Sequence, residues 1–156
     1  MANKVIGIGT FNAKLDNLTR DVQYIIDCAL YDAAGMVADA VKKELEAMHT
    51  HAEGYTAKGQ KRIGATESEK RQIIQNMGIS KFRNSQTSIG FTGYVHTISN
   101  KFGDNVPTGM LMQCIEYGTD FRQPTHTISK AYNSVRDKCV EIAQNRIDQE
   151  VNKIMN

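Results

Sequence analysis

The sequence predicts an α+β fold in which a small antiparallel β-sheet packs against two long helices, one N-terminal and one C-terminal. Apolar residues recur at three- and four-residue steps from about Ala13 to His49, and again from Thr127 nearly to the C-terminus. Between these segments, residues 79–99 change to the β-branched, alternating pattern of strands. With 156 residues the chain is long enough for a sizeable core, and we expect one domain, residues 1–156.

The composition is that of an ordinary soluble globular protein. Apolar residues make up 40% of the chain and charged residues 23%, and the net charge of +2 is too small to indicate nucleic acid or membrane by itself. No apolar run is long enough to span a bilayer, so we expect no membrane partner. The three cysteines, Cys28, Cys114 and Cys139, have apolar neighbours, which predicts buried free thiols in a reducing compartment.

The N-terminal third predicts a strand followed by a long helix. Residues Lys4–Phe11 carry the β-branched content of a short strand, weakened by two glycines. The helix then runs from Ala13 to His49, and Gly35 within it favours close packing or a bend. Its apolar stripe consists of Leu15, Leu18, Val22, Ile25, Ala29, Ala33, Met36 and Ala40.

A polar, glycine-containing stretch at 49–65 predicts a long mobile loop, a kind of segment that is often functional. After it, Thr66 and Glu69 have the spacing of a capping box, in which each residue caps the other's backbone. This pair predicts a short helix over Glu67–Met77 that Gly78 closes.

The strand region is expected to contain Lys81–Arg83 and Thr87–Ile98, joined by a polar turn at Asn84 and Ser85. The next segment favours a helix over Gly109–Tyr117, capped by Thr108; a third strand is the alternative.

The end of this helix and the start of the C-terminal helix are also predicted from nearby residues. Gly118 is expected to close the preceding helix, and the last helix begins near Thr127 or Ser129.

Few side chains in the sequence point to chemistry. His49 and His51 lack the further ligands that a metal site needs, so we expect neither a metal nor a cofactor. A cysteine–histidine hydrolase would require a cysteine close to His96 or His126 in the fold. Glu116 is the one carboxylate inside an apolar run, and it is read either as a general base or as an acid that caps a turn or pairs with Arg122.

A basic segment between residues 58 and 83 has seven basic and two acidic side chains. Its excess of positive charge is compatible with phosphate contacts, with docking on an acidic protein surface, or with a solvated loop. Few aromatic side chains accompany it, which does not favour base stacking. The basic residues are Lys58, Lys61, Arg62, Lys70, Arg71, Lys81 and Arg83.

One motif resembles a known family. Ile115-Glu116-Tyr117-Gly118-Thr119, a loop with Pro124, and a C-terminal helix follow one another here as they do in the small tail-completion proteins of tailed bacteriophages. These are neck, or head–tail joining, proteins, one of the minor tail protein families. The start of the chain, Gly9-Thr10-Phe11, is similar as well. The family signature residues are thus Glu116, Tyr117, Gly118, Thr119 and Pro124.

The resemblance implies a structural virion protein and not an enzyme. Such proteins form homo-oligomeric rings, commonly sixfold, between the head connector and the tail tube, and their partners are connector, tail terminator or tube proteins. The implied location is the virion neck, after assembly in the cytoplasm of the host bacterium. A basic loop facing the lumen would contact passing DNA without reading its sequence. A nucleic-acid-binding module that uses the basic segment is the alternative.

Overall fold

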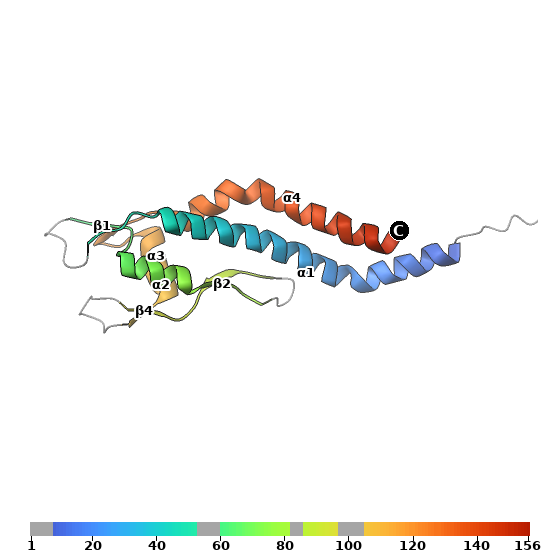
Figure 1. The fold of residues 1–156 in the computed structure, drawn as a ribbon, viewed down its shortest axis with the longest axis horizontal. Coiled ribbons are helices and arrows are strands. Elements are labelled where there is room, and N and C mark those ends of the chain that lie inside the picture. The colour runs from blue at the N-terminus through green and yellow to red at the C-terminus, as the bar shows by residue number, and fades with distance from the viewer. Residues whose placement is uncertain (1–7, 53–59, 82–85, 97–104) are drawn as a thin grey trace, which may run out of the picture.

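The computed structural model describes residues 8–52, 60–81, 86–96 and 105–156. The molecule is elongated, with two long helices side by side along its length and the shorter elements gathered at one end (Figure 1). The predicted α+β class is confirmed. The elements are α1 (Ile8–Ala47), β1 (Arg62–Ile63), α2 (Glu67–Gln75), β2 (Met77–Ile79), β3 (Ile89–Phe91), β4 (Tyr94–His96), β5 (Asn105–Pro107), α3 (Thr108–Tyr117), β6 (Arg122–Gln123) and α4 (Thr127–Met155).

Helices α1 and α4 form an antiparallel pair. The Lys14 ammonium group, near the start of α1, donates to the carbonyl of Met155 at the end of α4, at 2.5 Å. Further along, the Cys139 thiol donates to the Ala33 carbonyl at 3.7 Å. Both long helices were predicted, and the C-terminal one begins at Thr127, as expected. Of the apolar stripe predicted for α1, Ile25 and Ala29 are buried, whereas Leu15 and Val22 remain exposed.

The predicted N-terminal strand is wrong where the structure describes it. Helix α1 already begins at Ile8, so residues 8–11 are helical, and residues 4–7 lie outside the described ranges. The prediction of a mobile loop over 49–65 falls partly on residues 53–59, which also lie outside those ranges. Its described part includes β1 and an isolated bridge between Thr50 and Ala65.

Within the described residues, the strands form three two-stranded sheets and not one continuous sheet. Strands β2 and β3 pair antiparallel, as do β4 and β5, whereas β1 and β6 pair parallel. The predicted single strand over Thr87–Ile98 is divided by Gly93, whose φ of +71° turns the backbone between β3 and β4. Each described strand is only two or three residues long, so packing on the helices must stabilise the strands.

The partner of β3 also begins earlier than predicted. Strand β2 covers Met77–Ile79, so Gly78 lies in a strand and does not close α2, which ends at Gln75. Lys81 follows this strand, and the rest of the predicted strand and its turn, residues 82–85, lie outside the described ranges. Asn76, the C-cap residue, still donates its backbone N–H to the Gln72 carbonyl at 3.0 Å, as in a helix, and β2 begins at the next residue.

The main core lies at the end of the molecule where α1 finishes, between α1, α2, α3 and β4. Each buried aliphatic side chain of this kind contributes about 1.5–3 kcal/mol to folding. The paired helices beyond this core bury much less, and Ile25 and Ala29 are their main buried positions. The largest fully buried apolar side chains of the core are Val41, Leu45, Ile73, Val95, Met112 and Ile115.

Candidate functional site

Residues 115–129, which we call the corner, connect α3 to α4 and contain the signature. Gly118 ends α3 with a φ of +79°, and its backbone N–H donates to the Cys114 carbonyl at 3.0 Å. A Cβ atom on Gly118 would lie 2.9 Å from the Cδ atom of Pro124 and 3.0 Å from the Arg122 carbonyl oxygen. Glycine is therefore needed here both for its backbone conformation and for the space it leaves. The predicted helix closed by Gly118 is confirmed, and the alternative third strand is wrong.

The loop that leads into α4 is hydrogen-bonded back onto the end of α3. The Ile115 carbonyl accepts from the Thr125 backbone N–H at 2.9 Å and from the Thr125 hydroxyl at 3.1 Å. The Glu116 carbonyl accepts from the His126 backbone N–H at 3.3 Å. These bonds satisfy carbonyls that the end of a helix would otherwise leave unpaired.

Glu116 completes the exchange in the opposite direction. Its side chain accepts from the backbone N–H groups of Ile128 at 2.8 Å and Ser129 at 3.0 Å, and from the Ser129 hydroxyl at 2.6 Å. His126, the N-cap residue of α4, makes no side-chain cap and has a φ of +53°. The carboxylate of Glu116 thus caps α4 from the preceding helix, where the helix dipole also favours a negative charge.

The environment of Glu116 keeps it ionised. The side chain is buried, and burial by itself would raise the pKa of this carboxyl. The hydrogen bonds from Ser129 and Ile128 outweigh burial and hold the pKa below its usual value. Of the roles read from the sequence, the capping role fits this geometry, and the pairing with Arg122 is wrong.

Arg122 ties the corner to β1 and α2. Its side chain is 4% exposed; Nη1 donates to the Gly64 carbonyl and Nη2 lies 3.8 Å from Oε2 of Glu69. Burial lowers the pKa of the guanidinium, and Glu69 opposes this change, so Arg122 remains charged. Gly64 has a φ of +71°, and a Cβ atom there would overlap the His49 carbonyl oxygen at 1.8 Å. No local sequence pattern predicts this contact, because Arg122 and Gly64 lie 58 positions apart.

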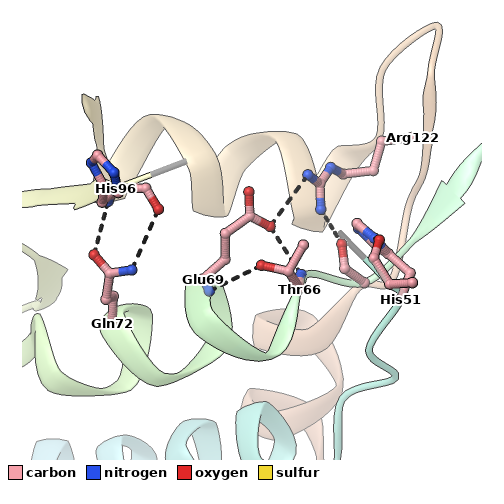
Figure 2. Close-up of polar contacts among 8 residues, drawn as sticks. His51, Thr66, Glu69, Gln72, His96 and Arg122 are labelled. Carbon is pink, nitrogen blue, oxygen red and sulfur yellow. Dashed lines mark hydrogen bonds and ion pairs between the residues drawn. The ribbon is translucent and has the colours of Figure 1, made fainter. Parts of the chain in front are cut away.

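Figure 2 shows how α2 holds its neighbours. Glu69 lies between Thr66 and Arg122: its backbone N–H donates to the Thr66 hydroxyl at 3.1 Å, and its carboxylate accepts the Thr66 backbone N–H at 3.0 Å. The predicted capping box is confirmed. One turn on, Gln72 accepts the His96 backbone N–H at 2.8 Å and donates to the His96 carbonyl at 3.4 Å, much as a neighbouring strand would.

Thr108 has a different role from the one predicted. It is the first residue of α3 and does not cap it, and Pro107 occupies the N-cap position without a side-chain bond. The Thr108 hydroxyl is buried and accepts from the Asn76 side-chain amide at 2.9 Å. This bond connects the start of α3 to the end of α2.

The basic segment does not form one loop. Lys58 and Arg83 lie outside the described residues, and the other five are distributed over β1, α2 and the residues next to β1 and β2. Lys70 is engaged at the end of α1, where its ammonium donates to the carbonyls of Glu46 at 2.8 Å and Met48 at 3.4 Å. A cation is favourable at this helix terminus. The exposed members are Lys61, Arg71 and Lys81, and Arg62 is half-buried in β1.

The cysteines and histidines offer no reactive pair in the part of the chain that the structure describes. Cys28, Cys114 and Cys139 are free, as predicted, but half-buried and not fully buried. Burial raises the pKa of the Cys139 thiol, which makes it less nucleophilic. Across the described ranges, no hydrogen bond joins a cysteine to a histidine, and no group of three or more potential ligands is arranged to hold a metal ion. None of the described helices combines the length and apolar character needed to cross a membrane.

The corner also presents aromatic side chains to solvent. Tyr117 is 73% exposed and Phe121 is 60% exposed, on either side of the Gly118 turn. Next to Tyr117 a hollow of about 300 Å³ lies between β3, α3 and the start of α4, and Glu116 and Ser129 contribute to its lining. The corner therefore combines a rigid, hydrogen-bonded interior with an exposed aromatic surface.

No family model, curated protein or solved structure matches this chain.

Proposed function

We propose that the chain is a structural subunit of the neck of a tailed bacteriophage, part of a ring that joins the tail tube to the head connector. The proposal starts from the resemblance of Ile115–Thr119 and the following loop to the tail-completion family. The structural observation that best supports the proposal is the set of hydrogen bonds at the corner between the end of α3 and the start of α4. The end of α3 accepts from Thr125 and His126, and Glu116 caps α4 in return.

This geometry favours a structural role for the signature. Its glycine and its glutamate lie where α4 leaves the short elements, and both oxygens of the Glu116 carboxylate already accept hydrogen bonds from Ile128 and Ser129. A general base needs an oxygen that is free to accept a proton from a substrate. The positions that the resemblance marks therefore hold two helices in a fixed relation and leave Tyr117 exposed for contact with another protein.

The shape of the molecule also suits a subunit that is completed by neighbours. The α1–α4 pair extends well beyond the main core (Figure 1). Several large apolar side chains of α1 between Ile8 and Tyr31 are exposed, which leaves apolar surface available for contact with another protein. They include Ile8, Phe11, Val22, Tyr24 and Tyr31.

Cosedimentation tests the proposal. The purified chain is mixed with phage tail tubes, with connectors, or with neither, and the pelleted fraction is measured. We expect saturable binding to tubes or connectors. Gly118→Val, which disturbs the corner, should weaken this binding, whereas an exposed change on α1, Lys42→Ala, should not. Equal recovery in the pellet with and without tubes and connectors contradicts the proposal.

Nucleic-acid binding is the alternative, and the exposure of Lys61, Arg71 and Lys81 favours it. Retention of the chain on duplex or single-stranded DNA at low salt, lost as the salt concentration rises, would support this alternative. Absence of retention at low salt would remove it.

A further inference from the structure

A shallow hollow lies between α1 and α4, away from the corner. Its volume is about 340 Å³, close to the lower end of ligand-pocket sizes, about 300–1,000 Å³. Tyr24 and Tyr31 stand on the same face of α1, two turns apart, and are 63% and 52% exposed. Exposed tyrosines of this kind are typical anchors of protein interfaces. The lining consists of Tyr24, Asp27, Cys28, Tyr31, Asp32 and Arg146.

One carboxylate of the hollow, that of Asp27, has no cationic partner among the residues that the structure describes. Asp32 lies 3.7 Å from Nε of Arg146, which in turn pairs with Glu150 at 3.3 Å. Asp27 accepts a hydrogen bond from the Gln23 amide at 2.8 Å, but forms no ion pair with any basic side chain in the described ranges. A carboxylate between two aromatic rings favours a lysine or arginine side chain, which gains both an ion pair and cation–π contact.

Exposed cations of the right kind lie at the other end of the molecule. Lys61 precedes β1 and Arg71 lies on α2, and both side chains are exposed. Lys70 fixes α2 beside the last residues of α1 through the Glu46 carbonyl. Helix α1 rises about 30 Å between Asp27 and its last residue, which is well beyond the reach of one side chain. The basic end of a chain therefore cannot occupy its own hollow (Figure 1).

We propose that the α1–α4 hollow receives the basic end, Lys61 and Arg71, of a second copy of this chain. The inference rests on the proposed function, because a ring closes only when one patch meets a different patch on the next copy. Contact between two hollows would place Asp27 opposite Asp27, and like charges oppose that arrangement. The opposite charges of the two patches thus select the head-to-tail contact that a ring needs.

Charge reversal at each patch tests the inference, with the oligomeric state measured by sedimentation velocity at several salt concentrations. We expect wild-type chains to self-associate, more weakly as the salt concentration rises. Asp27→Lys, and separately the double variant Lys61→Glu, Arg71→Glu, should each weaken association about tenfold or more. Matched controls with the same charge change, Asp39→Lys and the pair Lys130→Glu, Lys138→Glu, alter exposed residues elsewhere and should associate like the wild type.

Mixing the two reversed variants gives the sharper result. The hollow of Asp27→Lys is positive and can bind the now negative end of Lys61→Glu, Arg71→Glu. The unchanged hollow of the second variant can bind the unchanged basic end of the first. An equimolar mixture should therefore associate more strongly than either variant alone. Unaltered melting temperatures of both variants would show that the loss of self-association is not caused by unfolding.

The outcomes separate this inference from the proposed function. A wild-type chain that stays monomeric, reversed variants that associate normally, or a mixture that does not recover would each overturn the hollow as the contact. Binding to tail tubes or connectors that persists in any of these cases would leave the neck function standing. Recovery in the mixture without any binding to tubes or connectors would support the contact and contradict the neck function.

Discussion

Glu116 and Ser129 are joined by two hydrogen bonds: Oε1 of Glu116 accepts the Ser129 backbone N–H at 3.0 Å and the Ser129 hydroxyl at 2.6 Å. The last turn of α3 thereby caps the first turn of α4, and the loop between them returns hydrogen bonds to the carbonyls of Ile115 and Glu116. The side chain that caps α4 thus comes from a residue thirteen positions before Ser129.

Replacing Glu116 by glutamine should destabilise the fold by about 2 kcal/mol, because one carboxylate oxygen becomes an amide nitrogen that cannot accept a bond from α4 and the remaining bonds are no longer charge-assisted. Urea denaturation would measure the change in the free energy of unfolding. Glu141→Gln, which removes an exposed carboxylate of α4, is the matched control and should have almost no effect. Equal losses in the two variants would contradict the capping role of Glu116.

The stabilising effect of Glu116 should also depend on pH. Because the pKa of Glu116 is lower in the folded than in the unfolded chain, its contribution is fully present above the usual value of 4.5. It is lost as the pH falls from this value through the folded-state pKa. The stability difference between wild type and Glu116→Gln should therefore be constant near neutral pH and shrink below pH 4.5. A difference that stays the same down to the acid transition would show that the ionised form is not the one that caps.

Gly118→Val should be strongly destabilising, since a side chain at positive φ costs about 1–3 kcal/mol and would also meet Pro124 and the Arg122 carbonyl. Gly35→Ala makes a useful comparison, because nothing lies within 4 Å of a Cβ atom at that position in α1. There the change should stabilise the chain by about 0.5–1 kcal/mol. Thermal unfolding of the two variants should shift in opposite directions, and an unaltered melting temperature for Gly118→Val would contradict the turn described here.

Arg122→Met should cost about 3 kcal/mol or more, because it leaves Glu69 and the Gly64 carbonyl without their buried partner. In a double-mutant cycle with Glu69→Gln, the double variant should lose less than the sum of the single losses, by about 0.5–3 kcal/mol. Arg136→Met is the control: its pair with Asp137 is exposed and should contribute at most about 1 kcal/mol. Strict additivity for Arg122 and Glu69 would contradict their coupling.

The sequence predicts best those features whose cause is local. The capping box of Thr66 and Glu69 and the turn at Gly118 depend on residues a few positions apart, and both are confirmed. The limits of the strands are harder to predict, because strands of two or three residues are too short to show an alternating pattern.

The candidate site was only partly accessible from the sequence. The motif contains Glu116, but the groups that Glu116 binds lie on the next helix. A side chain that caps a helix from so far away in the chain has no recognisable sequence pattern. Arg122 contacts Gly64 across 58 positions of the chain, and Lys70 contacts Glu46 across 24. Such contacts follow from the packing of whole elements, so single-sequence patterns do not contain them.

Electron microscopy of the purified chain mixed with tail tubes tests the central proposal most directly. We expect closed rings of a single diameter, seated at one end of the tube, that are lost with Gly118→Val. Particles of monomer size together with bare tube ends, at concentrations where the chain remains folded, would contradict it.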